Sequence, residues 1–234
     1  MAYNFSPRII TDGLVLYLDA SNTRSYVSGS TIWNDLSRGG NTGTLVNGPT
    51  FNSGNGGSIV FDGSNDFVDC GTSSTSILRG GTQFTLNYWF KKFASNTDFL
   101  LGTLDDTANI GFFIQWFSDS VVYFGMSNGS RTYNFTNLPY TNNWINFTFT
   151  FNGSLSGNTN ISKLFINSTQ QTLSTFGTQS TIFPNNILNL YIGKLTNYSG
   201  IGKGDLSNLQ LYNRALSATE IRQNFNATKT RFGI

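Results

Sequence analysis

The sequence predicts an all-β protein, a two-sheet antiparallel sandwich with one short C-terminal helix. Apolar and aromatic residues alternate with polar ones over many short runs, which is the period of a half-buried strand. Asn-Gly, Asp-Gly and Gly-rich turns separate these runs. The 234 residues include 21 Phe, 10 Tyr and 4 Trp, which supply much of the core volume. One domain of ordinary sandwich size accounts for this length.

Four strands are expected in the N-terminal half, at 14–18, 59–61, 67–68 and 84–90. Residues 20–58 are expected to be rich in loops, because glycines and the Asn47-Gly48-Pro49 turn interrupt every periodic run. In the strand at 84–90, the parity of Phe84 is apolar throughout and is expected to face the core. The parity of Trp89 is expected to face the other way.

Seven further strands are expected, at 110–117, 121–126, 131–135, 146–151, 164–166, 188–192 and 206–212. Asn128-Gly129 predicts a hairpin between the second and third of them. One helix follows the last strand, where Ser217 and Glu220 have the spacing of a capping box. The chain has no other glutamate, and this pattern gives Glu220 a structural role.

The expected organisation is one sandwich domain over 12–226, with an extension at 1–11 and a tail at 227–234. Charged residues make up 11% of the chain and the net charge is +2, which argues against nucleic acid or an anionic membrane as a partner. No apolar run reaches about 18 residues, and the N-terminus does not resemble a signal peptide. Cys70 is the only cysteine, so an internal disulfide is excluded.

Short motifs occur in a fixed order: Gly13–Ala20, Trp33–Ser37, Asn41–Leu45, Val60–Gly63, Phe84–Leu86 with Trp89, Leu190–Gly193, and Leu211–Ser217 with Glu220-Ile221. Together they resemble the laminin G-like, concanavalin A-like lectin/glucanase jelly-roll family over nearly the whole chain. The closing segment, 224–234, resembles a subgroup among structural proteins of tailed bacterial viruses. The resemblance implies one concave and one convex sheet and binding of carbohydrate or protein, often with a structural calcium. Some relatives are glycoside hydrolases.

A hydrolase is the remote alternative. Glycosidases need two carboxyl groups about 5–10 Å apart, and hydrolases of this sandwich place them on one face of a short strand. The nearest acidic groupings are Asp62, Asp66 and Asp69, and Asp105-Asp106, in turn-like settings. Without histidine, a Ser-His-Asp triad and a His-ligated zinc site are both excluded. We therefore expect a protein that is not an enzyme.

Two kinds of ligand site are weighed against structural roles. The resemblance implies calcium ligands just before the last strand, where Asp205 and Asn208 are the candidates, but Ser207 and Asn208 replace the expected acids. Sugar stacking needs exposed rings, and Trp116, Tyr123 and Tyr133 are the candidates. Trp116 is expected to be the more exposed ring because it lies near the 117–120 turn. Trp33, Trp89 and Tyr198 are weighed as further candidates. Most aromatics in such a chain fill the core, and the positions of Trp89 and Trp144 beside strand starts favour packing.

The leading functional hypothesis is a non-catalytic virion structural protein, a capsid decoration or a tail or fibre component assembled in the host cytoplasm. Its partners would be other virion proteins or copies of itself, with a glycan-binding face as a further feature. Pro7, Arg8, Arg231 and Phe232 are the expected assembly contacts, since an extension can add main-chain hydrogen bonds to a neighbour. Deleting 1–8 or 228–234 is expected to abolish assembly and preserve the fold. The alternative is a carbohydrate-binding adhesin that reads a cell-surface glycan.

Overall fold

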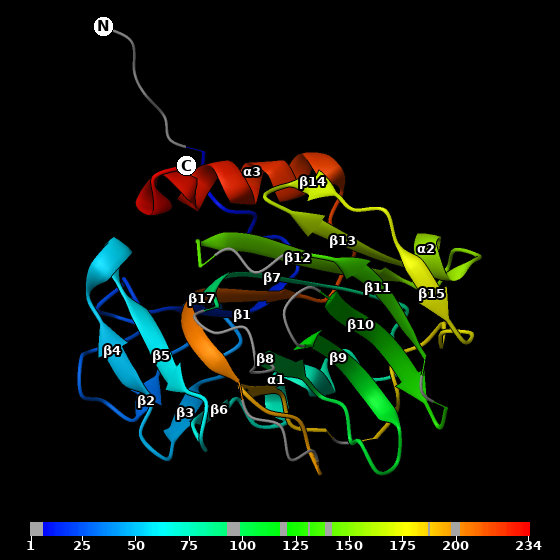
Figure 1. Cartoon of the computed structure of the whole chain (residues 1–234), viewed down its shortest axis with the longest axis horizontal. Coiled ribbons are helices and arrows are strands. Elements are labelled where there is room, and N and C mark those ends of the chain that lie inside the picture. The colour runs from blue at the N-terminus through cyan, green and yellow to red at the C-terminus, as the bar shows by residue number, and fades with distance from the viewer. Residues whose placement is uncertain are drawn as a thin grey trace, which may run out of the picture.

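The computed structural model describes residues 7–92, 99–117, 121–130, 132–138, 142–186, 188–197 and 202–234. Two β-sheets in which every neighbouring pair is antiparallel pack face to face (Figure 1). The predicted antiparallel sandwich with a C-terminal helix is therefore confirmed. None of the helices in these ranges is long and apolar enough to span a membrane.

The first sheet, sheet A, has eight strands. In spatial order they are β14 (Thr169–Gln170), β13 (Ser162–Ile166), β12 (Ile145–Asn152), β7 (Gln83–Lys91), β17 (Lys203–Tyr212), β5 (Ser58–Asp62) and β4 (Thr50–Asn52), and β1 (Leu14–Asp19) pairs with the second half of β17. The first half of β17 pairs with β5. The long predicted strands at 84–90, 146–151 and 206–212 thus lie side by side at its centre.

The second sheet, sheet B, has nine strands. Their order is β15 (Ser174–Phe176), β11 (Tyr133–Asn137), β10 (Val121–Asn128), β9 (Ile110–Phe117), β8 (Phe99–Gly102), β16 (Tyr191–Ile192), β6 (Phe67–Asp69), β3 (Gly43–Val46) and β2 (Ile32–Trp33). Three short strands, β2, β3 and β4, lie within 20–58, which was expected to be rich in loops and for which no strand was predicted. Two to four residues contain too few alternations for the periodicity to be recognised.

The core between the sheets is mainly aromatic. The Phe84 ring lies 4.9 Å from Phe112, 5.5 Å from Phe149 and 5.9 Å from Phe183, centroid to centroid. All four side chains are at most 1% exposed, and burial of each contributes about 1.5–3 kcal/mol. Phe84 faces this core and Trp89 faces away from it, as the alternation predicts.

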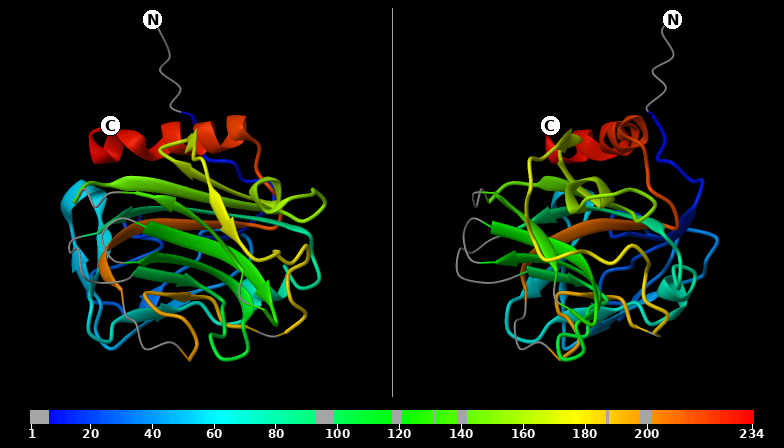
Figure 2. Two further views of the ribbon diagram at one scale, coloured as in Figure 1. Left: turned by 45° about the vertical axis from the view of Figure 1, so that its right-hand side comes forward. Right: turned by 90° about the vertical axis from the view of Figure 1, so that its right-hand side faces the viewer.

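The predicted helix is α3 (Ala218–Thr228), which continues into the 3-10 turn η2 (Lys229–Phe232); α1 (Ser73–Ser76), α2 (Asn158–Ile161) and the 3-10 turn η1 (Gly54–Gly56) are short. The capping box is confirmed, because Ser217 Oγ accepts from the Glu220 amide and Glu220 Oε2 accepts from the Ser217 amide at 2.8 Å. Arg214 also pairs with Glu220 at 2.6 Å. Figures 1 and 2 show α3 lying along the outer face of sheet A.

The C-terminal segment is packed against the sandwich. The Phe232 ring stacks on Trp89 at 4.0 Å and is 8% exposed, and Arg231 Nη1 lies 3.2 Å from Asp19 Oδ1. This packing argues against the expectation that residues 228–234 can be deleted without harm to the fold. The helical spacing of apolar residues ends at Phe225. The contacts of Arg231 and Phe232 are long-range, so no local sequence pattern predicts them.

Candidate carbohydrate-binding face

Four aromatic side chains lie together on the outer face of sheet B. We call Tyr123, Tyr133, Phe135 and Phe176 the aromatic row. Tyr123 on β10 is opposite Phe135 on β11, and Tyr133 on β11 is opposite Phe176 on β15. The Tyr123 and Tyr133 rings are 5.1 Å apart and nearly perpendicular, and the Tyr133 and Phe176 rings are 5.1 Å apart and stacked.

Strand alternation places these rings outward. Val122 and Phe124 of β10 are fully buried in the core, so Tyr123 between them must point to the other face. Gly125 allows β10 and β11 to approach closely, since a Cβ atom there would lie 2.4 Å from the Thr132 carbonyl oxygen. The backbone of the two strands therefore fixes the spacing of the rings.

The aromatic row lies at the border of a buried cluster. Leu100, Leu104, Phe113 and Leu195 are buried together on the outer side of sheet B, and Tyr123 and Tyr133 pack against them. The outer end of the row is open, because Phe176 is 57% exposed. Large rings with one side packed and the other in solvent combine apolar area with polar tips. Such a surface suits a ligand that has both C–H faces and hydroxyl groups.

The structure brings together two of the three predicted sugar-stacking residues. Trp116, expected as an exposed ring, is 4% exposed and packs in the core 5.4 Å from Phe147. Its parity on β9 is that of Phe112 and Ile114, a signal that outweighs its closeness to a turn. Phe135 and Phe176 were not predicted. Tyr198 lies outside the described residues.

The outer face of sheet A is polar but covered by α3. Asn87 donates to Gln210 Oε1 at 2.9 Å and accepts from Asn146 Nδ2 at 3.0 Å and Thr148 Oγ1 at 2.7 Å. These four side chains are at most 1% exposed. Trp89 Nε1 donates to Thr228 of the helix at 2.8 Å. The amides on this face bind one another and cannot reach an external ligand.

The residues expected to hold calcium do not fit that ion. Asp205 and Asn208 are 2% and 0% exposed, and Asp205 Oδ1 and Asn208 Oδ1 have no hydrogen-bond partner among the described residues. However, Lys91 is the cross-strand neighbour of Asp205, and Arg231 donates to the intervening Ser207 at 2.8 Å. Calcium requires six to eight oxygens, and here basic side chains adjoin the carboxylates: Lys91 is opposite Asp205, and Arg231 pairs with Asp19, the cross-strand neighbour of Asn208. Burial raises the pKa of Asp205 to about 6.

The acidic groupings weighed for catalysis have turn-forming roles. Asp66 Oδ2 accepts from the Asp62 amide at 3.0 Å, and Asp62 Oδ1 accepts from Ser64 at 2.7 Å. Asp105 Oδ1 accepts from two backbone amides, and these bonds lower its pKa. Within the described ranges, no three His, Cys, Asp or Glu side chains form a group able to hold a metal.

Pro7 and Arg8, two of the expected assembly contacts, are exposed. The Arg8 carbonyl oxygen accepts from Gln223 Nε2 of α3 at 2.8 Å, and the Ile10 amide donates to Asn224 Oδ1 at 2.8 Å. This N-terminal segment is therefore held along the helix and presents its side chains outward.

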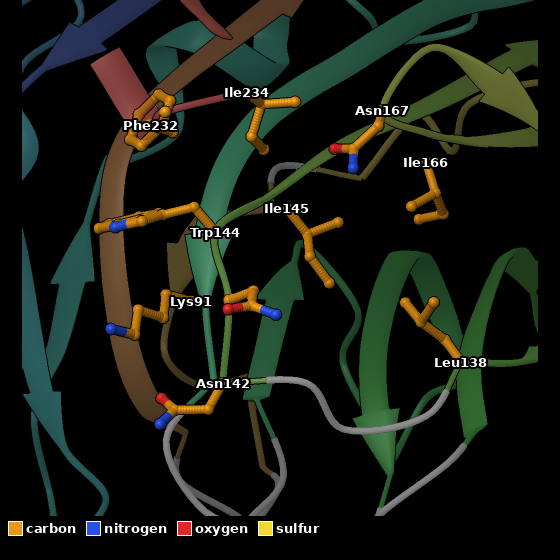
Figure 3. A pocket seen from close by; sticks show the side chains of 11 residues that line it. Lys91, Leu138, Asn142, Trp144, Ile145, Ile166, Asn167, Phe232 and Ile234 are labelled. Atoms are coloured by element: carbon orange, nitrogen blue, oxygen red, sulfur yellow. The ribbon is translucent and has the colours of Figure 1, made fainter. Parts of the chain in front are cut away.

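A cavity of about 530 Å³ lies where the C-terminal segment meets β12 and the β13–β14 turn (Figure 3). Trp144 lies between Phe232 and Lys91 in this view, with Asn142 beyond Lys91. Trp144 Nε1 donates to Asn55 at 3.0 Å and its ring is 4.9 Å from Phe232. The buried rings of Trp144 and Phe232 join the C-terminal segment to the sandwich, so the lining of this cavity has a packing role.

A sequence model described as "Concanavalin A-like lectin/glucanases superfamily", of the laminin G type, matches residues 61–222. The chain belongs to this superfamily. No curated protein matches the chain. The resemblance inferred from the motifs is thereby confirmed for the family, whereas the virus subgroup stays a prediction.

Solved structures show the same fold at low sequence identity. A structure titled "Cell entry of botulinum neurotoxin type C is dependent upon interaction with two ganglioside molecules" has a TM-score of 0.69 and 16% identity, covering 94% of this chain and 52% of that chain. A botulinum C/D mosaic receptor-binding domain gives 0.68 and 15%, covering 92% and 51%. Trypanosoma rangeli sialidase in complex with sialic acid gives 0.64 and 13%, covering 94% and 33%.

The chain spans about half of those two toxin chains and a third of that sialidase chain. The ligands and the activity named in their titles belong to the whole proteins. For this chain the structural similarities show the sandwich fold. A function can be assigned only on the evidence of this chain's own residues.

Proposed function

We propose that the chain is a non-catalytic, lectin-like module that binds glycan through the aromatic row. The carrying observation is the exposure of Phe176 beside half-buried Tyr123 and Tyr133, on the sheet face that α3 leaves uncovered. The botulinum C/D mosaic structure named above is titled as a receptor-binding domain, which is consistent with a binding role for this sandwich.

A binding role agrees with the use of the chain's acids. The carboxylates of Asp62, Asp66 and Asp105 bind nearby backbone amides, and Glu220 binds Arg214. General acid and base catalysis needs a proton donor and an acceptor on either side of the scissile bond. The aromatic row offers rings and hydroxyls instead, which can hold a sugar without cleaving it.

A glycan array followed by calorimetry tests this proposal. Phe176→Ala and Tyr133→Ala are expected to weaken binding of a neutral oligosaccharide hit about tenfold, the equivalent of about 1.4 kcal/mol. Ile77→Ala is the matched control, because Ile77 is 54% exposed and lies outside the row. Unchanged affinity in both ring variants, or absence of any sugar binding by the parent protein, would contradict the proposal.

We also propose that the module works in a virion, on the capsid or as part of a tail or fibre, next to other virion proteins or copies of itself. The closing segment's resemblance to virus structural proteins and the low charge support this setting. Pro7 and Arg8 remain the candidate contacts, because they are exposed beside α3. Arg231 and Phe232 are engaged within the chain.

Particle incorporation tests the virion setting. The double substitution Pro7→Ala, Arg8→Ser is expected to reduce the amount of the chain in purified particles while its melting temperature is unchanged. Substituting Arg24, another arginine with an exposed side chain, by Ser provides the control. Normal incorporation of the double variant would remove the role assigned to the N-terminal segment.

A further inference from the structure

A second group of polar and aromatic side chains crosses sheet B on the same outer face, on β3, β6, β16 and β8. Thr44, Asp69, Tyr191 and Gly102 are successive cross-strand partners. They point outward, since the next residue on β6, Val68, is fully buried in the core. Thr44 is exposed, so this line is open at its β3 end, whereas Gly102 at its β8 end is buried.

Hydrogen bonds hold the polar groups of this line in place. Asn189 Nδ2 lies 3.1 and 3.2 Å from the two Asp69 carboxylate oxygens and 3.2 Å from the Tyr191 hydroxyl. The Gly71 amide donates to Asp69 Oδ1 at 2.7 Å. A carboxylate has about four acceptor positions, and these three contacts leave Asp69 capacity for about one more donor. Burial and the nearby Asp69 charge raise the pKa of Tyr191, which keeps its hydroxyl protonated.

A lysine ammonium group lies beside these acceptors. Lys194 Nζ is 3.8 Å from the Phe67 ring centroid and 4.5 Å from that of Tyr191, and the two rings are 5.8 Å apart at 78°. Cation–π contact with two rings orients the ammonium. The ion pairs found among the described residues involve Arg214 and Arg231 and leave Lys194 without a carboxylate partner. Its charge is thus positioned but not neutralised.

We propose that Asp69, Asn189, Tyr191 and Lys194 form a second subsite that binds an acidic sugar residue. Two sugar hydroxyls bind Asp69 and Asn189, the Tyr191 hydroxyl donates to a ring or hydroxyl oxygen, and the sugar carboxylate pairs with Lys194. This inference rests on the proposed glycan-binding function and adds the ligand's chemical class, because the aromatic row contains no charged side chain.

The charge pattern favours an acidic sugar over the other ligands of similar size. A purely neutral sugar would leave the Lys194 ammonium unused, and a simple anion would be repelled by Asp69. A divalent cation would meet one carboxylate next to an ammonium, which is a poor oxygen set. A uronic acid carries hydroxyls and a carboxylate on one ring. Its hydroxyls can donate to Asp69 while its carboxylate pairs with Lys194.

Calorimetric titration with acidic trisaccharides of galacturonate, glucuronate, mannuronate and guluronate tests the subsite, each paired with its carboxyl-reduced neutral form. At least one acid form is expected to bind more tightly than its reduced partner, and added salt should weaken that preference. Lys194→Met should reduce the affinity for the acid form about fivefold, the range of an exposed ion pair. Lys194→Arg should retain it.

Asp69→Asn should weaken the reduced form more than the acid form, since it alters hydroxyl binding for both but also removes a charge that repels the sugar carboxylate. Lys203→Met is the matched control, because Lys203 is another half-buried lysine of the sandwich. Equal affinity of every acid with its reduced form, or unchanged binding by Lys194→Met, would overturn the subsite. If the reduced, neutral sugars still bound and Phe176→Ala still weakened that binding, the proposed function would stand without the subsite. If the parent protein bound acid forms but no neutral sugar, the role of the aromatic row would be overturned instead.

Discussion

The two outer faces of the sandwich invert the usual distribution of side chains. On sheet A, amides and hydroxyls such as Asn87, Asn146 and Gln210 are buried, because α3 covers them. On sheet B, Phe176 and its neighbouring tyrosines reach solvent. The comparison teaches that the helix decides which face can serve a ligand: the polar face serves the fold and the aromatic face remains open.

The difference also separates two uses of stacked rings. Trp89 and Phe232 stack at 4.0 Å beneath the C-terminal segment, and Tyr133 and Phe176 stack at 5.1 Å on the open face. The interplanar angles, 18° and 17°, are nearly the same. Similar geometry therefore has different energetic consequences, because the first pair is buried and the second is partly in water.

The largest expected effect comes from truncating one phenylalanine of each pair. Phe232→Ala should lower the free energy of unfolding by about 3 kcal/mol, as for other buried rings, because it also removes the contact with Trp144. Phe176→Ala should change it by about 0.5 kcal/mol or less, as for exposed positions. Urea unfolding measures both. Equal losses would show that the two faces do not differ as described.

A smaller effect is expected from one asparagine on each face. Asn87→Ala should cost about 2 kcal/mol, since it strands the partners Asn146, Thr148 and Gln210 in a buried layer. Asn137→Ala, at an exposed position of β11, should be within about 0.5 kcal/mol of the parent. Thermal melting distinguishes the two variants. If Asn87→Ala left the stability unchanged, the polar layer under α3 would have to be solvated.

The smallest effect concerns pH. Because burial raises the pKa of Asp205 to about 6, the folded protein favours the protonated acid more than the unfolded chain does. Stability from this site is complete below the ordinary aspartate pKa and falls as the pH rises through about 6. The free energy of unfolding of Asp205→Asn should therefore be about 1 kcal/mol higher than that of the parent at alkaline pH. This gain should vanish in acid; a gain that is independent of pH would refute the assignment.

Local patterns predicted much of the fold. Alternation assigned the inward parity of β7, and Ser217 with Glu220 located the start of α3. The same patterns could not predict that α3 covers sheet A, since Trp89 and Thr228 are 139 residues apart. For that reason the Trp89 face, polar in sequence, could not be recognised as buried.

The candidate site was predictable only in part. Tyr123 and Tyr133 were identified as candidates, but their proximity depends on the register of β10 and β11. Phe176 belongs to a three-residue strand, too short to show alternation. Tyr191 and Asp69 are neighbours only because β16 pairs with β6, and no sequence spacing encodes that contact.

Both ends of the described chain lie on the same side of the molecule. The Arg8 carbonyl accepts from Gln223, and Arg231 reaches Asp19 at the end of β1, so residues near both ends lie along sheet A and its helix (Figure 1). A short peptide could bridge them without crossing sheet B. The sandwich is thus suited to circular permutation, or to grafting as a cassette into a host loop, with its aromatic face pointing away from the graft.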